Sequence, residues 1–316
     1  MTYTTFSIEN LEILIQPTGM IKKLILTMTT ILAVSTSYAN IDSLRYRIIE
    51  YCNNYNASIG VAMTLIEDSD TMSINGDKMF PMLSVYKLPI AMSVLNSVDN
   101  GWQTLQTPIH VIQNDIHPNT WSPLRDKLTT ADTFINLSDI IQYTLIQSDN
   151  NCSDLLLKSI GGVETVQTYL KKLGLPNIQV NNTEWEIFQS WNLIYSNQAT
   201  PQDITTLLNK LYSEALFSDS CYSFLWHTLT DSTTGNSRIK GKLPKRTEVA
   251  HKTGTSFTTQ EGITPAINDV GIITMPNGKH IAISIFVAES KESREVNENI
   301  IAEITKIVWD YAISKE

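Results

Sequence analysis

The chain has 316 residues, of which 42% are hydrophobic and 17% are charged, and this composition excludes an intrinsically disordered or collagen-like protein. A chain this long buries about three quarters of the surface that its unfolded form would expose, so it can form a core without a disulfide or a metal. The 32 acidic residues outnumber the 23 basic ones, and the net charge of −9 argues against nucleic acid as the main partner.

Residues 20–39 have the pattern of a secretory signal peptide. Met20 is followed by two lysines, by a mostly apolar segment and by a small-x-Ala ending at Ala39. We therefore predict that Met20 is the initiator and that residues 1–39 are removed, so that the mature chain starts near Asn40. The apolar segment is shorter than the about 20 residues that a membrane span needs, so the mature form is not expected to be held in a membrane.

The next patterns along the chain predict a pair of strands. Apolar residues alternate with small or polar ones over residues 59–65, as in a strand with one buried face. Residues 67–70 form a turn sequence, and the alternation resumes over 72–74. Together they predict an antiparallel hairpin.

Helical spacing replaces this alternation from about residue 84 to about residue 230. Ser138 is placed to cap one of the expected helices. Ser153 is placed to cap a second helix that ends at Gly161.

Strand patterns return after about residue 245. Segments 270–273 and 281–285 flank the turn sequence at 276–279, which predicts a second hairpin. Apolar residues from Ile300 to Tyr311 lie on one face of a closing helix. The early and late hairpins must therefore meet in one sheet, with the helical segment inserted between them.

The three cysteines, Cys52, Cys152 and Cys221, are widely spaced and form no CxxC pair. We expect buried or idle thiols, although one disulfide with one thiol left over stays open. Only five histidines are present, none of them in an HExxH or HxH pair, so a zinc site is not expected.

Ser84 and Lys87 form a Ser-x-x-Lys motif. On a helix, residues three apart share a face, so the hydroxyl and the amine can meet. A lysine that is desolvated or placed near other cations can be the neutral base that activates a serine. The motif alone is weak, because a second copy occurs at Ser237 and Lys240.

Ser148, Asp149 and Asn150 follow the helix expected to end near residue 146. A serine here can relay a proton, and an asparagine amide can hold a substrate carbonyl or the lysine. This motif is also weak alone, because Ser-x-Asn recurs at Ser73 and Ser190. A helix cap or a turn is the plain alternative.

Lys252, Thr253 and Gly254 follow a strand-like segment. A cation, a hydroxyl and a glycine on one strand suit an anionic substrate that docks along that strand, and glycine permits a close backbone approach. The alternative is an ordinary exposed strand end.

The order of the three motifs is specific. Ser148 lies 64 residues after Ser84, and Lys252 lies 104 residues after Ser148, whereas the copy at Ser237 fails this order. In this arrangement the sequence resembles the class A β-lactamases, serine enzymes related to penicillin-binding proteins. The resemblance covers nearly all of the chain that follows the signal peptide.

The resemblance implies an α+β fold of three layers, α/β/α, with a five-stranded antiparallel sheet flanked by helices. It implies an α/β domain at 40–79 plus 236–316 and an all-helical domain at 80–235, with the active site between them. It also implies a periplasmic bacterial protein that is a monomer, acts on a small β-lactam and uses no metal or other cofactor.

Glu184 matches the glutamate that class A enzymes carry on an omega-shaped loop, where it activates the water that hydrolyses the acyl-enzyme. The register from Ser148 and from Pro201 supports Glu184, and Glu186 is the competing choice. Penicillin-binding proteins generally lack this glutamate.

The resemblance implies further roles. Ser84 is the nucleophile, Lys87 or Glu184 through a water takes its proton, and Ser148 passes a proton to the leaving nitrogen. The backbone N–H groups of Ser84 and Thr255 form the oxyanion hole. The residues expected to bind substrate are Asn150, Lys252, Thr253, Gly254, Thr255, Arg238 and Trp121.

Some positions leave alternatives or depart from the family. Trp121 could instead be a core aromatic, and Arg238 a solvated cation. Many members have an asparagine that helps hold the water where this chain has Phe188, which bears on deacylation more than on the fold. The Arg–Asp pair that clamps the loop in most members is replaced by Asn182 and Asn197, as in a divergent branch from Bacteroidetes and some extended-spectrum enzymes, which often prefer cephalosporins.

We therefore expect a class A serine β-lactamase that hydrolyses penicillins and cephalosporins through a Ser84 acyl-enzyme and confers β-lactam resistance. A D,D-peptidase or penicillin-binding protein would share Ser84 and Lys87 but would not need Glu184. A β-lactam sensor would acylate and then stall, and Phe188 gives this alternative some weight.

Overall fold

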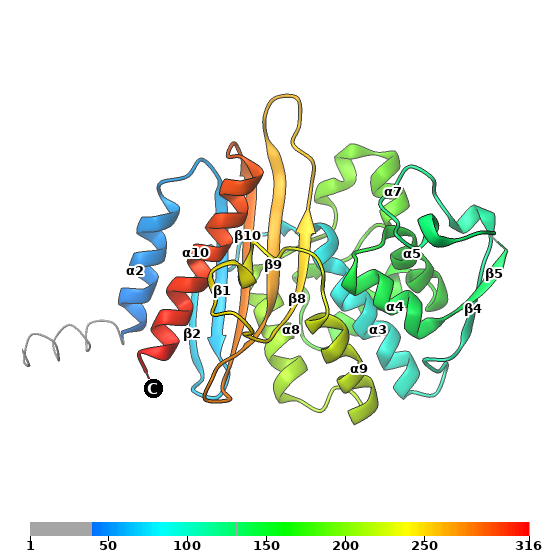
Figure 1. Ribbon diagram of the computed structural model, residues 1–316, viewed down its shortest axis with the longest axis horizontal. Coiled ribbons are helices and arrows are strands. Elements are labelled where there is room, and N and C mark those ends of the chain that lie inside the picture. The colour runs from blue at the N-terminus through cyan, green and yellow to red at the C-terminus, as the bar shows by residue number, and fades with distance from the viewer. Residues whose placement is uncertain (1–39, 131, 316) are drawn as a thin grey trace, which may run out of the picture.

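The computed structural model describes residues 40–130 and 132–315, so the predicted signal peptide lies outside the described residues. A five-stranded antiparallel sheet with the order β2-β1-β10-β9-β8 forms its centre (Figure 1). Its strands are β1 (Ser58–Leu65), β2 (Asp70–Ile74), β8 (Val249–Thr255), β9 (Thr264–Thr274) and β10 (His280–Ser290). Both predicted hairpins are confirmed, and β1 pairs with β10 from Ser58↔Ala288 to Leu65↔Ile281.

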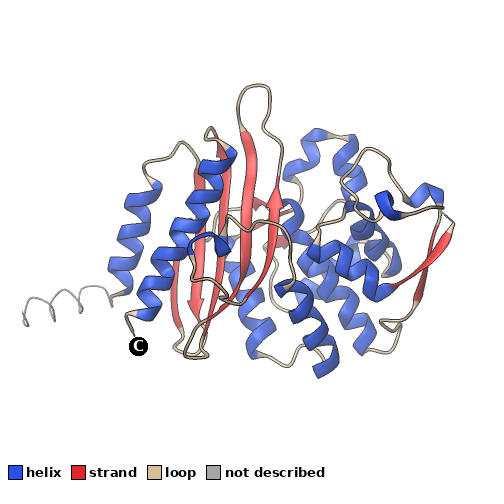
Figure 2. Ribbon diagram, in the orientation of Figure 1, coloured by secondary structure: helices blue, strands red, loops and turns tan. Residues whose placement is uncertain are grey.

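Helices cover both faces of this sheet, as Figure 2 shows. The helices α2 (Ile41–Cys52) and α10 (Arg294–Ile313) pack on one face, and α8 (Pro201–Ser213) packs on the other. Neighbouring residues of a strand point to opposite faces. Ile283 therefore joins the core beneath α2 and α10, whereas Ala282 joins the core on the side of the helical segment. The expected α+β fold of three layers is confirmed.

The segment between β2 and β8 is mostly helical, and two small sheets interrupt it. One pairs β4 (Pro108–Val111) with β5 (Thr133–Asn136), and the other has the order β3-β7-β6. The predicted all-helical segment 80–235 thus also contains strands, each at most four residues long and too short to leave an alternating pattern. Its remaining α-helices and short strands are α3 (Lys87–Asp99), α4 (Leu137–Ile146), α5 (Asn150–Ser159), α6 (Val163–Lys172), α7 (Glu184–Gln189), α9 (Asp219–Thr230), β3 (Phe80–Pro81), β6 (Ile178–Gln179) and β7 (Gln198–Ala199).

Two predicted helix caps are wrong. Ser138 lies inside α4, whose preceding residue Asn136 makes no capping hydrogen bond through its side chain. Ser153 lies inside α5, and the cap of that helix is Asp149, whose carboxylate accepts a hydrogen bond from the Cys152 N–H at 2.9 Å. Serine and aspartate both favour the cap position, so local sequence does not choose between them.

Two further features concern the cysteines and the apolar character of the helices. All three cysteines are free thiols, with Cys152 and Cys221 buried and Cys52 partly buried, so the disulfide that the sequence left open is not formed. Among the described residues, no helix has both the length and the apolar character needed to cross a membrane.

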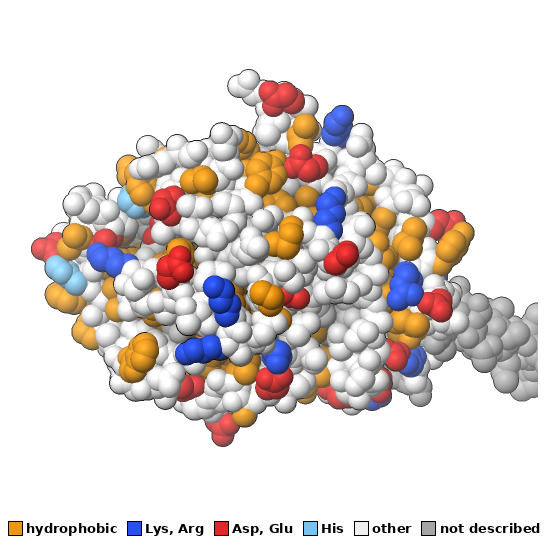
Figure 3. All heavy atoms as spheres, turned by 180° about the vertical axis from the view of Figure 1, so that it is seen from behind, with side chains coloured by type: hydrophobic (Ala, Val, Ile, Leu, Met, Phe, Trp, Pro, Cys, Tyr) orange, Lys and Arg blue, Asp and Glu red, His pale blue; other side chains and the backbone are white. Residues whose placement is uncertain are grey.

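Charge is distributed unevenly between the surface and the interior. On the face seen in Figure 3, Lys and Arg side chains are interspersed with Asp and Glu. Among the described residues, three cations are instead buried: Lys87 and Lys252 are 0% exposed, and Arg238 is 1% exposed. Buried cations require nearby oxygen ligands or counter-ions, and the ones that surround these three define a site.

Candidate active site

Ser84 lies in a short 3-10 helix, η1 (Leu83–Tyr86), directly after β3. The residue before it, Leu83, has a φ of +48°, a left-handed conformation that costs a non-glycine residue about 1–3 kcal/mol. The surrounding chain holds it there, since Asn268 on β9 donates from Nδ2 to Pro81 O at 2.8 Å and to Met82 O at 3.1 Å. The half-buried Ser84 is thus held in a strained turn that is fixed to the sheet.

The first residue of α3, Lys87, is where the predicted motifs meet. Its Nζ donates to Ser148 O at 2.9 Å, lies 3.0 Å from Glu184 Oε1, and makes a short hydrogen bond to Asn150 Oδ1. The sequence predicted that Ser84 and Lys87 could meet. They are neighbours on one turn, but the ammonium donates to these oxygen atoms and not to Ser84 Oγ.

The second motif joins the helical side to the sheet. Ser148 has a φ of +61°, and its Oγ accepts a hydrogen bond from Lys252 Nζ at 2.9 Å. Asn150 bonds Lys87 with one end of its amide and donates to Thr120 Oγ1 at 2.7 Å with the other. Ser148 therefore lies between the two lysines, contacting one with its carbonyl and the other with its hydroxyl.

Asp149 lies between Ser148 and Asn150, and the sequence analysis predicted no role for it. Its carboxylate is fully buried, accepts from the Leu124 N–H at 2.7 Å, and lies 3.0 Å from Ser122 Oγ. These bonds hold the segment that carries Trp121 against the start of α5. A carboxylate in the centre of a catalytic motif could have suggested such an anchor.

Glu184 opens α7, and its side chain is only 13% exposed. The sequence missed the group that holds it. Asp154 of α5 accepts from the Glu184 N–H at 2.8 Å and from the Trp185 N–H at 2.9 Å. Burial, and then the nearby Glu184 carboxylate, raise the pKa of Asp154 to about 7. Asp154 lies four residues after Asn150, a helical spacing that places both on one face and was available as a clue.

The competing glutamate, Glu186, is engaged elsewhere. Its carboxylate accepts from the Thr183 N–H at 2.9 Å and forms a capping box with that residue. The N–H of Thr183 lowers the pKa of Glu186. Of the two glutamates considered, the geometry therefore brings Glu184 to Lys87.

Asn197 closes the base of the loop that carries α7. Its Oδ1 accepts from the Asn181 N–H at 2.7 Å and from the Asn182 N–H at 2.9 Å, and its Nδ2 donates to Asn182 O at 2.8 Å. The Asn197 carbonyl also accepts from the Met82 N–H at 2.8 Å. A neutral amide thus connects the two ends of the loop where most class A enzymes have an ion pair.

The rim of the site is aromatic. Trp121 is 63% exposed, and its Nε1 donates to Gln147 O at 2.9 Å, so it is not a core aromatic. Phe188 is 48% exposed and lies on α7.

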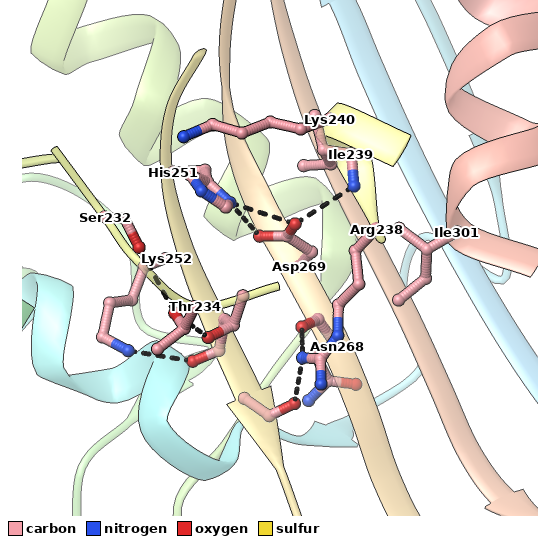
Figure 4. A network of polar contacts seen from close by, with 12 residues as sticks. Ser232, Thr234, Arg238, Ile239, Lys240, His251, Lys252, Asn268, Asp269 and Ile301 are labelled. Carbon is pink, nitrogen blue, oxygen red and sulfur yellow. Dashed lines mark hydrogen bonds and ion pairs between the residues drawn. The ribbon is translucent and has the colours of Figure 1, made fainter. Parts of the chain in front are cut away.

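The third motif lies on β8, the edge strand of the main sheet, and Figure 4 shows its polar contacts. Lys252 Nζ donates to Ser148 Oγ at 2.9 Å and to Thr253 O at 3.0 Å. Burial, followed by the charge of Lys87, places the pKa of Lys252 well below its usual value. A Cβ on Gly254 would lie 2.3 Å from Met82 O, so β8 runs directly against the residues that precede Ser84.

The backbone N–H of Thr255 faces away from the sheet. In an antiparallel ladder, successive residues pair alternately with the neighbouring strand. The Ser256 N–H donates to Ala266 O at 2.9 Å, on the side of β9. The N–H of Thr255 therefore points to the free edge of β8.

Arg238 is buried against β8 and β9 (Figure 4). Its Nη1 donates to Gly254 O at 3.0 Å and to Asn268 O at 2.9 Å, and its Nη2 donates to Thr255 Oγ1 at 2.8 Å. Nη2 also lies 3.1 Å from Glu298 Oε1, which leaves Nε without a partner. The solvated-cation alternative is wrong. The guanidinium reaches the site through the hydroxyl of Thr255.

Two anions that the sequence analysis did not predict, Asp269 and Glu298, lie near the cations Arg238 and Lys252. Asp269 on β9 is fully buried and accepts from His251 Nδ1 at 2.9 Å and from the Ile239 N–H at 3.2 Å (Figure 4). Its charge favours the protonated forms of Arg238 and Lys252. Glu298 on α10 pairs with Arg238. Neither anion belongs to a motif, so only the fold brings them to the site.

Known proteins are similar to this chain over most of its length. The sequence profile of the beta-lactamase enzyme family matches residues 43–312. The beta-lactamase VEB-1 of Pseudomonas aeruginosa is 41% identical over 93% of this chain and 99% of its own length, and the extended-spectrum beta-lactamase PER-1 of the same organism is 32% identical over 94% and 97%.

Solved structures agree with these relatives. The TLA-1 extended-spectrum beta-lactamase is 43% identical with a TM-score of 0.85, covering 86% of this chain and 99% of its own. A class A beta-lactamase from Bacteroides cellulosilyticus is 35% identical with a TM-score of 0.82, covering 86% and 98%. The chain therefore belongs to the beta-lactamase enzyme family and is a class A β-lactamase.

Proposed function

We propose that this β-lactamase opens the β-lactam ring of penicillins and cephalosporins through an acyl-enzyme on Ser84, and that Glu184 drives the hydrolysis of that acyl-enzyme. The observation that carries the proposal is the position of Glu184 Oε1, 3.0 Å from Lys87 Nζ. A transpeptidase that shares Ser84 and Lys87 would not need a carboxylate there.

Acylation begins when Ser84 Oγ attacks the β-lactam carbonyl carbon. The hydroxyl proton leaves to Lys87, or to Glu184 through a water, and Ser148 delivers a proton to the ring nitrogen as the C–N bond breaks. The N–H groups of Ser84 and Thr255 stabilise the developing oxyanion, and donors of this kind are worth about 2.7–4 kcal/mol each in other hydrolases.

The substrate carboxylate docks along β8. Lys252 and the hydroxyls of Thr253 and Thr255 recognise it, and Gly254 allows the close approach. Arg238 acts through Thr255, because its Nη2 donates to the hydroxyl of that residue at 2.8 Å. The Asn150 amide holds the side-chain amide of the substrate, and Trp121 forms the wall of the entrance.

Deacylation uses a water that Glu184 deprotonates. The hydroxide adds to the ester carbonyl, and the bond between the acyl carbon and Ser84 Oγ breaks. The proton then passes from Glu184 to Ser84 Oγ. Phe188 cannot bond this water, so Glu184 has to hold it with the help of other groups.

The test is nitrocefin turnover by the mature protein beside Ser84→Ala and Glu184→Gln. Ser84→Ala should lose turnover, and Glu184→Gln should accumulate an acyl-enzyme that intact-mass spectrometry detects. A wild type that acylates and stalls would instead establish a β-lactam sensor, and turnover by Ser84→Ala would refute the nucleophile.

We also propose the setting in which this reaction occurs. The pattern of residues 20–39 supports export to the bacterial periplasm after removal of residues 1–39. The extended-spectrum names of relatives such as PER-1 support activity on a broad set of cephalosporins and a role in antibiotic resistance. We place the candidate site between the α/β part (40–79 plus 236–316) and the helical part (80–235), and we propose that the protein is a monomer. Light scattering of the mature protein tests that last point.

A further inference from the structure

The helix that carries Glu184, α7, is short and lies outside the hydrophobic core. α7 has six residues, and none of them is buried. Helices this short are not stable in water by themselves. Contacts to neighbouring segments must therefore set the place of α7, and through it the distance of Glu184 from Lys87.

One of these contacts is an aromatic stack. The Trp185 ring lies on the His117 ring with centroids 3.8 Å apart and planes at 8°. The Phe188 ring continues the stack from α7, 5.5 Å from Trp185 at 15°. Aromatic pairs contribute about 0.5–1.5 kcal/mol beyond the area they bury. Because Trp185 directly follows Glu184, the stack acts on the backbone next to the carboxylate.

The partner ring rests on a fixed segment. The His117 N–H donates to Asn151 Oδ1 at 3.1 Å, and Asn151 is fully buried. Arg125 Nη1 donates to Pro118 O at 2.6 Å and to Thr120 O at 2.7 Å. The backbone contacts of its own segment therefore hold His117 in place, whereas α7 has no buried residue to fix it.

The same segment reaches the substrate side of the cleft. Thr120 Oγ1 accepts from Asn150 Nδ2 at 2.7 Å, and Asn150 in turn bonds Lys87. Trp121 follows directly. One short segment thus contacts the group expected to hold substrate at one end and the Glu184 helix at the other.

We propose that His117 and Trp185 are positioning residues for Glu184, and that their stack sets the rate at which the acyl-enzyme is hydrolysed. The inference rests on the proposed function, because it takes Glu184 as the base of deacylation. Burial lowers the pKa of His117, so the ring is neutral at pH 7 and contributes its flat surface rather than a charge.

The experiment measures the decay of a preformed acyl-enzyme by intact-mass spectrometry. Trp185→Ala and His117→Ala should each slow the decay roughly 10- to 100-fold, the scale expected when a catalytic group moves by about 1 Å. Acylation should slow no more than it does in Glu184→Gln. The double variant should decay no more slowly than the worse single variant, because one stack is lost in all three.

Conservative variants separate the stack from general disruption. His117→Phe and Trp185→Phe retain a ring and should restore most of the decay rate. The chain also offers a matched control in the stack of His110 and Phe134, with centroids 4.6 Å apart and planes at 15°, on β4 and β5. Phe134→Ala should leave the decay unchanged.

Three outcomes would overturn the proposal. The first is a wild-type decay rate in Trp185→Ala, and the second is an equal slowing in Phe134→Ala. The third is a failure of His117→Phe to recover while its melting temperature matches the wild type. If Glu184→Gln itself deacylates normally, the proposed function fails instead, and the two failures are thereby distinguished.

Discussion

The two sides of the catalytic cleft are built in different ways. The Ser84 side is core structure, because β8 and β9 clamp η1 and both lysines are fully buried. The Glu184 side is a surface loop, whose helix has no buried residue and is held by an amide, a carboxylate and a stack. Damage to the first side should therefore affect acylation and folding most, and damage to the second should affect deacylation more than acylation.

The largest effect should come from Gly254→Ala on the core side. Its Cβ would lie 2.3 Å from Met82 O, so β8 and η1 must separate, and the N–H groups of Ser84 and Thr255, which we propose bind the oxyanion, must move apart. We expect kcat/KM for nitrocefin to fall roughly 100-fold or more.

Gly262→Ala is the matched control. It adds a methyl group at a φ of +77° with no atom within 4 Å, so it tests backbone strain without a contact. This variant should lose stability and keep its acylation rate. A large loss of acylation in Gly262→Ala would show that the contact with Met82 does not explain the effect of Gly254→Ala.

Asp154→Asn should weaken the loop side in a pH-dependent way. The pKa of Asp154 is about 7 in the folded protein against an ordinary value of 3.8, so the folded state binds the extra proton between these limits. The contribution of Asp154 to stability is therefore present below about pH 4 and is lost as the pH rises to about 7.

Melting temperatures from pH 4 to pH 8 check this expectation. The wild type should lose stability relative to Asp154→Asn as the pH rises through that window. A constant difference between the two proteins would show that Asp154 does not titrate there. The acyl-enzyme of Asp154→Asn should also decay more slowly, because an asparagine carbonyl accepts fewer N–H groups than a carboxylate.

Asn197→Ala should have a smaller effect on the same side. It removes two acceptor bonds and one donor bond at the base of the loop, all of them partly buried. A hydrogen bond of this kind contributes about 0.5–1.5 kcal/mol, so denaturant unfolding should show a loss of at least this order. Deacylation should slow more than acylation, and the reverse order would contradict the division between the two sides.

The sequence analysis predicted the parts of the candidate site that are formed by short motifs in a fixed order along the chain. Lys87, Ser148 and Lys252 belong to motifs with fixed spacing, and the structure joins them, because Ser148 accepts a hydrogen bond from each of the two lysines. The two hairpins were predictable because strand alternation and turn residues are local signals.

The unpredicted part consists of buried polar residues whose partners are distant in sequence. Asp154 bonds N–H groups about 30 residues away, and Asn268 bonds carbonyls more than 180 residues away. Arg238 was expected at the site, but its burial depends on β8, β9 and α10 together. No local pattern encodes such contacts, because each depends on elements that meet only in the folded chain.

The pairing of β1 with β10 has a consequence for how the enzyme comes into being. Ser58 pairs with Ala288, so the first strand has to wait for the last one before the sheet can close. Pairing between strands this far apart in sequence is slow, because closing the long loop costs chain entropy before the contacts between the strands have formed. The contact of β8 with η1 also needs residues from both halves, so a nascent chain has no catalytic cleft. Activity therefore begins only after β10 has been synthesised and has paired with β1.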